Sequence, residues 1–400
     1  MKGEEVVITA AIRSPIGSFG GVFREMRAPE LAVPVMKALI DRTGIDPGII
    51  DDVIWGCAYQ RVRDEANIAR VAAIRAGIPH TVPGVTVQRV CTSAMWAIVS
   101  GIQAIRLGDA EVILAGGVES MSTVPFTVDG MRWGSRLGHM EINDALWDGL
   151  TRLGIGPSMG ITAENLAERC RISREEQDEF ALRSHRFAVK ANHEGRINEE
   201  IVPIQVPQKR GGTLIVEKDE GPRADTSLEK LSQLKPVFKK EGTVTAGNSS
   251  SMNDGAAGVL LMSRRKAEEL GMPPMARIVS YGVAGVDPDI MGVGPVPATQ
   301  KALKMANLEL KDIDLIEVNE AFAAQYLAVE KELGLNREIT NVNGGGISLG
   351  HPVGATGCRI LVTLLYEMAR RRAKFGLATL CGGGGVGMAL IVERIESTLL

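Results

Sequence analysis

The sequence has almost no net charge and no long apolar run. Its 45 Lys and Arg side chains nearly balance 48 Asp and Glu, which leaves a net charge of −3. Without a strong field of one sign, neither nucleic acid nor an anionic membrane surface is expected as a partner. The apolar run at residues 6–12 is too short for a secretory signal, and no uninterrupted apolar stretch is expected to span a membrane. We therefore expect a cytoplasmic protein.

Cysteine is scarce, and its spacing argues against two kinds of site. The chain has five cysteines, an odd number, and none of them shows the short paired spacing of a zinc site. We expect neither a disulfide framework nor a metal centre, and free thiols in a reducing compartment fit this pattern better. The five positions are Cys57, Cys91, Cys170, Cys358 and Cys381.

Apolar strands alternate with helices in the first part of the chain. Residues 6–12, 50–56 and 112–117 are expected strands, and helices are expected between them at 30–43 and 65–76. Strands that are apolar throughout indicate burial on both faces. This alternation predicts an α/β fold with a parallel sheet that is covered by helices on both sides.

The chain divides into two similar halves with an insertion between them. Four hundred residues exceed what one hydrophobic core usually organises. The strand at 112–117 ends in glycines, and residues 377–383 repeat this pattern, which predicts duplicated halves rather than one long sheet. Within the insertion, Ser173 opens a capped helix, whereas residues 196–245 are polar and loop-like. The expected parts are an N-terminal half at 1–121, the insertion at 122–250, a return to the N-terminal half at 251–275, and a C-terminal half at 276–400.

Cys91 lies where an apolar strand is expected to run into a helix. Residues 85–90 are typical of a buried strand, and apolar residues at helical spacing follow Cys91 as far as Gly108. The unpaired N–H groups at a helix start favour a thiolate there. Taken alone, Cys91 is also consistent with a small buried hydrophobe, which is the commoner role of a free cysteine.

Three further candidate residues lie in the C-terminal half. His351 and Cys381 occur in glycine-rich runs, where the backbone can approach a ligand closely. An imidazole is the natural base for a thiol, and a second thiol is useful when a second substrate must lose or gain a proton at carbon. Asn319, at a strand end, could donate to a carbonyl or orient a water. The alternative is that it caps a helix starting at Glu320.

These separated motifs together resemble the thiolase family, in particular its acetyl-CoA acetyltransferases (acetoacetyl-CoA thiolases) and 3-ketoacyl-CoA thiolases. The matching stretches are residues 13–17, 319–322, 350–352 and 381–385, in the family's order along the whole chain. The resemblance implies an α/β fold of two duplicated halves in αβαβα layers. The insertion would be a loop domain that covers coenzyme A.

The resemblance also implies the chemistry, which is acyl transfer between two acyl-CoA molecules in either the condensation or the thiolytic direction. Cys91 would take the acyl group as a thioester, with His351 activating it. Cys381 would move the α-proton of the second substrate. Asn319, through a water, and His351 would form one oxyanion hole, and the N–H groups of Cys91 and Gly383 would form the other.

Coenzyme A is implied as a substrate, and neither a tightly bound cofactor nor a metal is implied. Residues 242–250 match the family's pantetheine-binding segment, although a plain turn has a similar composition. The family is oligomeric, so a homodimer or homotetramer is expected, and a requirement for a partner subunit stays open. The implied contacts with coenzyme A are Ser250, Ala246, Gly247, Met159, Phe322 and, toward the nucleotide, Arg223.

Three positions depart from the common family pattern and bear on the choice of substrate. Bulky Trp96 follows the nucleophile, Ser158 precedes the Met of the coenzyme A loop, and Ser251 replaces a usual glycine. The segment Trp147 to Leu150 nevertheless resembles short-chain members, which favours acetyl-CoA and acetoacetyl-CoA as substrates. The alternatives are a thiolase for longer, branched or aromatic 3-oxoacyl-CoA in a degradation pathway, and a non-catalytic coenzyme A-binding subunit.

Overall fold

The N-terminal half is built on a five-stranded sheet. A computed structural model describes residues 4–61, 63–209 and 211–396. Its strands follow the order β1-β10-β5-β3-β4, and the short β2 pairs with β10. The bounds are β1 (Val6–Arg13), β2 (Gly17–Ser18), β3 (Asp52–Gly56), β4 (Gly84–Val87), β5 (Val112–Ser120) and β10 (Asn253–Ser263).

The C-terminal half repeats this plan. Its order is β11-β14-β13-β12, so β11, β14, β13 and β12 correspond to β1, β10, β5 and β3. The two sheets are joined where β1 pairs with β11 through Val7–Arg277 and Ile8–Ala276. The expectation of two separate sheets is therefore wrong at this edge, because two antiparallel first strands meet there. The bounds are β11 (Ala276–Gly285), β12 (Leu315–Val318), β13 (Phe375–Gly382) and β14 (Val386–Arg394).

The sheet is mixed, whereas a parallel sheet was predicted. Among the described strands, β3–β4, β3–β5 and β12–β13 are the only parallel pairs, and the longest strands pair with one another in antiparallel fashion. Burial on both faces made these strands apolar regardless of direction, so composition could not reveal their orientation. Strand β4, which was expected to be buried, is a half-exposed edge strand because β3 is its only neighbour among the described strands.

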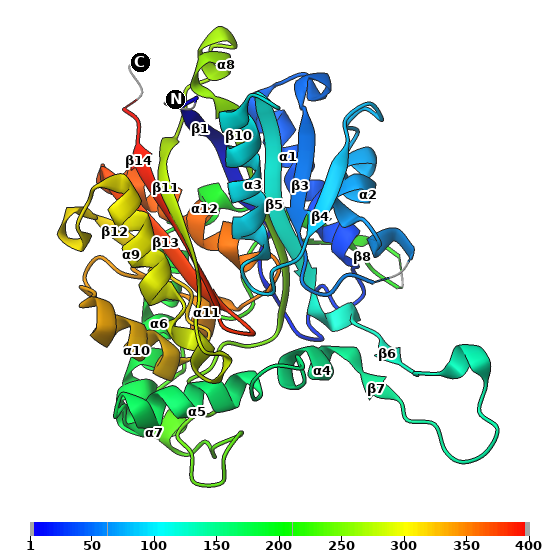
Figure 1. Cartoon of the computed structure of the whole chain (residues 1–400), viewed down its shortest axis with the longest axis vertical. Helices are drawn as coiled ribbons and strands as arrows, with labels where there is room; N and C mark the ends of the chain where they lie inside the picture. Colours follow the sequence, from blue (N-terminus) through cyan, green and yellow to red (C-terminus); the bar gives the residue numbers. More distant parts are fainter. Residues whose placement is uncertain (1–3, 62, 210, 397–400) are drawn as a thin grey trace.

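Helices form three layers around the sheet, and Figure 1 shows them on both of its sides. The central layer holds α3 (Ser93–Leu107) and α12 (Thr356–Arg371), whose apolar side chains share one core with both half-sheets. Alternate residues of the same strands point outward into two further cores, under α1 (Ala28–Thr43) with α2 (Ile68–Arg75) and under α9 (Pro295–Ala306) with α10 (Ala323–Leu333). The αβαβα layering is thus confirmed.

The first turns of the two central helices touch each other. A Cβ on Gly357 in α12 would stand 2.7 Å from the Met95 nitrogen of α3. Only glycine permits this approach, which places both helix N-termini at one point of the molecule. The predicted end of α3 is confirmed, since Gly108 caps it at φ 83°.

The segment between β5 and β10 contains more regular structure than expected. Ser173 and Glu176 form the predicted capping box of α6. The stretch 196–245, expected to be a loop, contains the hairpin β8–β9 and helix α7. These were missed because each strand of the hairpin is only four residues long and α7 only five. The remaining bounds are α4 (Ala145–Thr151), α5 (Met159–Arg169), α6 (Arg174–His193), β8 (Ile204–Pro207), β9 (Thr213–Val216), α7 (Leu228–Ser232), α8 (Arg264–Glu269) and α11 (Gly346–Leu349).

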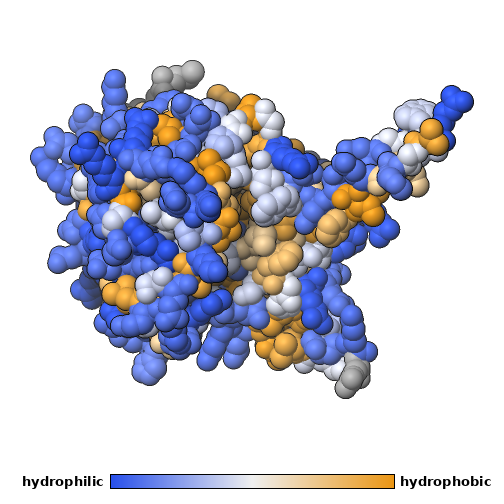
Figure 2. All heavy atoms as spheres, turned by 90° about the horizontal axis from the view of Figure 1, so that it is seen from below, coloured by the Kyte–Doolittle hydropathy of each residue, from blue (hydrophilic) through white to orange (hydrophobic). Residues whose placement is uncertain are grey.

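An arm at residues 126–143 extends away from the body, as Figures 1 and 2 show. Its base is the two-stranded pair β6 (Phe126–Thr127) and β7 (Asn143–Asp144). Large apolar side chains on the arm face solvent, and Trp133 and Leu137 are 87% and 98% exposed. Such exposure is unusual for side chains of this size and marks a contact surface.

One described segment passes the length and composition test for a membrane span. Val90–Leu107 is apolar on average, although polar residues such as Gln103 and Arg106 interrupt it, so it is not the uninterrupted apolar stretch that the sequence was expected to lack. Within the fold, 56% of the segment is buried, because α3 is a central core helix. Core helices pass the same test, which makes the segment weak evidence for a membrane span.

Candidate active site

Cys91 lies in a tight turn at the entrance to α3. The preceding residue, Val90, has φ 49°, a conformation that a β-branched residue rarely adopts. Ser93 closes the turn, since its hydroxyl accepts from the Arg89 N–H at 2.8 Å and donates to the Val90 carbonyl at 2.6 Å. Backbone strain of this kind costs about 1–3 kcal/mol and is typical of functional sites.

The structure brings Cys91, Gly383 and Cys381 together. The Gly383 N–H donates toward the Cys91 sulfur, and the two thiols are close enough that charge on Cys91 raises the pKa of Cys381. The turn after Cys381 requires glycine, because Gly384 and Gly385 have φ of 81° and 87°. The end of β13, which carries Cys381, therefore lies next to the start of α3, which follows Cys91, although the two elements belong to different halves.

Both thiols are neutral at physiological pH. Burial raises the pKa of Cys91 to about 11 and outweighs the Gly383 and Cys91 N–H groups, which lower it. Burial also raises the pKa of Cys381, and the charge on Cys91 adds to this. The expectation that the start of α3 holds a thiolate is thus wrong for the unliganded protein, because desolvation is the larger effect.

His351 is held as one neutral tautomer. Its Nδ1 lies 2.7 Å from the Thr356 hydroxyl, which itself donates to the Pro352 carbonyl at 2.9 Å. Since that hydroxyl proton is already committed, Nδ1–H must be the donor to Thr356, and Nε2 carries a free lone pair. Burial and the charge of Arg359 lower the pKa of His351 to about 3, so the ring is uncharged at neutral pH.

Asn319 lies beside His351 at the end of β12. Its Nδ2 is 3.4 Å from both ring nitrogens of His351, and its buried Oδ1 has no hydrogen-bond partner among the described residues. Such an atom indicates a place for a water or a substrate group. The alternative that Asn319 caps a helix is wrong, because α10 begins at Ala323 with Phe322 at its N-cap.

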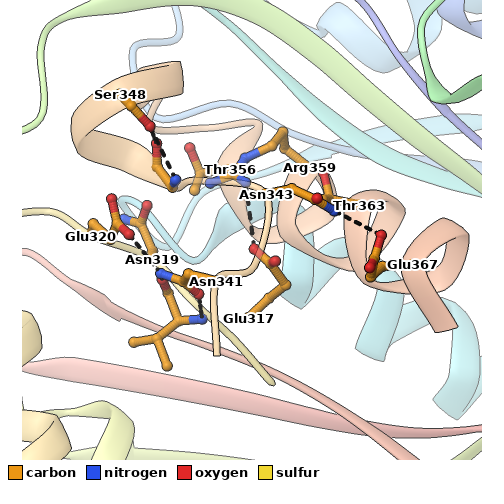
Figure 3. Close-up of polar contacts among 12 residues, drawn as sticks. Glu317, Asn319, Glu320, Asn341, Asn343, Ser348, Thr356, Arg359, Thr363 and Glu367 are labelled. Atoms are coloured by element: carbon orange, nitrogen blue, oxygen red, sulfur yellow. Dashed lines mark hydrogen bonds and ion pairs between the residues drawn. The ribbon is translucent and has the colours of Figure 1, made fainter. Parts of the chain in front are cut away.

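A buried polar network holds the loop that contains Asn319 (Figure 3). The Glu320 carboxylate accepts hydrogen bonds from Ser184 at 2.6 Å, Asn341 at 2.9 Å and the Ile347 N–H at 3.2 Å. Asn341 also bonds both the N–H and the carbonyl of Val318 at 2.8 Å. These bonds keep the chain after β12 out of a helix and explain why α10 starts three residues later than predicted.

A second buried carboxylate, Glu119, ties the Cys91 side to the His351 loop. It accepts from the N–H groups of Ala58, Tyr59 and Gly354 at 2.9, 3.3 and 3.0 Å, and from the Cys57 thiol at 3.3 Å. Burial raises its pKa to about 7 despite these donors. Glu119 thus links the end of β5 to the chain after β3 and to the loop before α12.

The segment expected to bind pantetheine lies next to Phe322 and His351. The Ser250 N–H donates to the Ala321 carbonyl at 2.9 Å, Ser249 pairs with Phe322, and Met252 pairs with His351. Glu164 of α5 anchors the segment by accepting from the Thr243 and Val244 N–H groups at 2.9 Å. Ala246 is exposed and Gly247 is half-buried against α7, so both are within this same strip of chain.

Met159 and Phe322 share one apolar cluster with Cys381. The Met159 sulfur lies 3.1 Å from where a Cβ on Gly383 would stand. Arg223 lies elsewhere, since its N–H donates to His185 Nδ1 at 3.3 Å. It lines a cavity of about 420 Å³ beside α6, together with Arg186, Lys190 and His193. The structure therefore places Gly383, Met159 and Phe322 beside the thiols, and Arg223 in a cavity beside α6.

Sequence reasoning missed Thr356 and Glu119. Thr356 follows His351 by five residues, a spacing that gives no signal until the turn is folded. Glu119 was detectable in principle, because it is a lone acid that continues the apolar run of β5. A charged residue inside a buried strand needs partners and is a candidate for a structural or functional role.

Two family models match nearly the whole chain. The thiolase N-terminal domain matches residues 6–265, and the thiolase C-terminal domain matches residues 272–394. The chain belongs to the thiolase family. The resemblance stated from its motifs is confirmed.

This thiolase is similar to proteins with assigned names over almost its full length. An acetyl-CoA acetyltransferase of Pseudomonas aeruginosa is 54% identical, with 98% of this chain and 100% of the relative covered. The crystal structure of the Bacillus anthracis acetyl-CoA acetyltransferase gives a TM-score of 0.96 at 54% identity, covering 98% and 100%. The human mitochondrial 3-ketoacyl-CoA thiolase in complex with CoA gives 0.95 at 45% identity, covering 98% of each.

The neutral state of Cys91 predicts how this thiolase reacts with iodoacetamide. Only the thiolate reacts, so the alkylation rate at Cys91 should rise about tenfold per pH unit through pH 9, with no plateau near pH 7. Peptide mass mapping after timed quenching measures the rate at each cysteine, and half-exposed Cys170 is the internal control. A plateau at Cys91 below pH 8 would show that a thiolate–imidazolium pair already exists without substrate.

Proposed function

We propose that the protein is an acetyl-CoA C-acetyltransferase that interconverts two acetyl-CoA with acetoacetyl-CoA and coenzyme A. The observation that carries this proposal is the proximity of two thiols, one of which accepts from the Gly383 N–H. The base proposed for them is His351, a neutral imidazole of fixed tautomer. A thiolase needs one sulfur as acyl carrier and one as a base toward carbon. The names of the similar proteins support the same reaction.

In the first half-reaction Cys91 is the nucleophile. His351 Nε2 takes the thiol proton as the sulfur attacks the thioester carbonyl of the first acyl-CoA. The carbonyl oxygen becomes negatively charged and is stabilised by the N–H groups of Cys91 and Gly383. The carbon–sulfur bond to coenzyme A breaks, the departing thiolate recovers the proton from His351, and acetyl-Cys91 remains.

In the second half-reaction Cys381 first gives its own thiol proton to solvent, from which it is recovered at the end of the cycle. The resulting thiolate takes a proton from the α-carbon of the second acetyl-CoA. A thiol whose pKa is raised is a strong base once ionised, which suits removal of a weakly acidic carbon proton. His351 and a water on Asn319 stabilise the enolate oxygen. The α-carbon then attacks the acetyl carbonyl, and the carbon–sulfur bond to Cys91 breaks. The Cys91 thiolate that is released recovers a proton from Cys381.

Coenzyme A is proposed to lie along residues 246–250. Ser250, Ala246 and Gly247 line this strip, and Met159 and Phe322 are the apolar contacts on the way to the sulfur atoms. Arg223, with Arg186 and Lys190, gives a cationic cavity that suits the phosphates of the nucleotide end.

The chain is further proposed to form a homodimer or homotetramer through the arm at 126–143. The arm exposes Phe126, Met131, Trp133, Leu137 and Ile142, each by more than 60%. Side chains of this size each gain about 1.5–3 kcal/mol when buried, so a second copy is a fitting cover. No feature of the described residues requires a different partner subunit.

Intact-mass analysis with acetyl-CoA tests the proposed reaction. The wild type and Cys381→Ala should each gain one acetyl group, whereas Cys91→Ser should gain none. Thiolysis of acetoacetyl-CoA, followed by loss of its absorbance, should be lost in Cys381→Ala, because no thiol remains to return a proton to the α-carbon of the acetyl-CoA that leaves. Cys170→Ala, at the end of α5, is the control and should retain both acetylation and thiolysis. A Cys381→Ala enzyme that still makes acetoacetyl-CoA would contradict the roles given to the two thiols.

Removal of the Thr356 hydroxyl should free the His351 ring. Thr356→Val is expected to lower kcat about 10- to 100-fold with little change in KM, since a buried donor loses about 1–3 kcal/mol of hydrogen bonding. Thr356→Ser keeps the hydroxyl and should restore most of kcat. Thr363→Val also removes a buried hydroxyl of α12, far from His351, and serves as the control. An equal loss of kcat in both valine variants would mean that Thr356 acts only through stability.

Light scattering coupled to size exclusion tests the arm. The double variant Trp133→Ser, Leu137→Ser should have a lower molar mass than the wild type, because the apolar surface that the partner covers is lost. Leu107→Ser replaces a leucine of the body that is 77% exposed and should leave the mass unchanged. Equal masses for the wild type and the double variant would place the interface elsewhere.

A further inference from the structure

The two thiols face different apolar clusters. Cys91 packs against a cluster whose buried members are Met121, Leu146 and Val353, and Tyr59 and Leu150 pack there as well. Cys381 belongs to the separate cluster with Met159 and Phe322, on the proposed coenzyme A side. An acyl group carried on Cys91 would therefore meet apolar side chains that are separate from those of the pantetheine strip.

Three contacts hold Tyr59 in place within the cluster around Cys91. A Cβ on Gly149 would stand 2.4 Å from the Tyr59 ring and 2.5 Å from its hydroxyl oxygen, so the hydroxyl end of the ring is in direct contact with the α4 backbone. The hydroxyl donates to the Leu146 carbonyl at 3.3 Å. At the other end, the Tyr59 N–H donates to the buried Glu119 carboxylate at 3.3 Å.

The Tyr59 hydroxyl also lies within electrostatic reach of the Cys91 sulfur. Burial raises the pKa of Tyr59, and the charges of Glu119 and Cys91 raise it further. This electrostatic effect agrees with the apolar cluster that Tyr59 and Cys91 share. The ring stands between the nucleophile and α4 and cannot move outward, because Gly149 is already in contact.

We propose that Tyr59, backed by Gly149, forms the end wall of the acyl-binding space at Cys91 and restricts the acyl group to short unbranched chains. This inference rests on the proposed acyl transfer at Cys91. A longer chain has to displace the ring, break its bond to Leu146 and expose apolar surface of α4. The bulky Tyr59 thereby favours acetyl transfer over a reaction with longer or branched substrates.

Thiolysis rates with two substrate lengths test the wall. For the wild type, Tyr59→Phe, Tyr59→Leu and Tyr59→Ala, kcat/KM is measured with 3-oxobutanoyl-CoA and with 3-oxooctanoyl-CoA. Tyr59→Ala should raise the ratio of long to short substrate about 10- to 100-fold, since a few methylene groups gain a pocket. Tyr59→Phe keeps the wall and should keep the wild-type ratio. Tyr59→Leu should give an intermediate ratio and decides the matter if the alanine variant does not fold.

The wild-type ratio in both Tyr59→Leu and Tyr59→Ala would overturn the proposal. Acetylation of Cys91 by acetyl-CoA, read by intact mass in every variant, separates this outcome from failure of the proposed function. If the wild type itself is not acetylated, the proposed acyl transfer at Cys91 is wrong, and the result says nothing against the role of Tyr59. If it is acetylated and the ratio does not respond to residue 59, the acyl group lies elsewhere.

Discussion

The site depends on buried carboxylates, which accept the backbone hydrogen bonds that water would otherwise accept where several loops meet. Loops that meet inside a protein bring backbone N–H groups with no helix or strand partner, and each unpaired group costs about 1–3 kcal/mol. Glu119, Glu164 and Glu320 each accept backbone donors from segments distant in sequence. Their positions decide where Cys91, the pantetheine segment and Asn319 lie. The reactive groups are therefore held mainly by acids that have no part in the proposed chemistry.

The same burial determines the charge state of the site. Desolvation keeps both thiols protonated and the imidazole neutral, so the unliganded site carries little charge. Because Cys91 is not ionised at rest, the N–H groups around it are not bound to a thiolate and can stabilise an oxyanion that forms during the reaction. A neutral resting site with oriented donors gives more stabilisation to the transition state than to the ground state.

Sequence patterns were sufficient for the parts of the fold that follow local rules. The capping box at Ser173, the stop at Gly108 and the apolar strand β5 all depend on neighbours in the chain. Strand direction, the β1–β11 joint and the late start of α10 depend on distant partners such as Asn341, and no local pattern encodes them. Among the site residues, His351 and Cys381 stood out by their glycine setting, and Cys91 by its place between an apolar run and a helix. Thr356, Glu119 and Tyr59 did not, because their roles arise only from tertiary contact.

The contact between the first turns of α3 and α12 has a consequence for how such a site can originate. The two helices hold equivalent places in the two halves, and the loops before them supply Cys91 and His351 respectively. Two identical half-chains paired about a twofold axis would present two copies of one loop, with the same residue on each side. Fusion into a single polypeptide lets the copies diverge, so that one becomes the acyl carrier and the other the proton acceptor. The asymmetry of the chemistry thus requires covalent linkage of a symmetric scaffold.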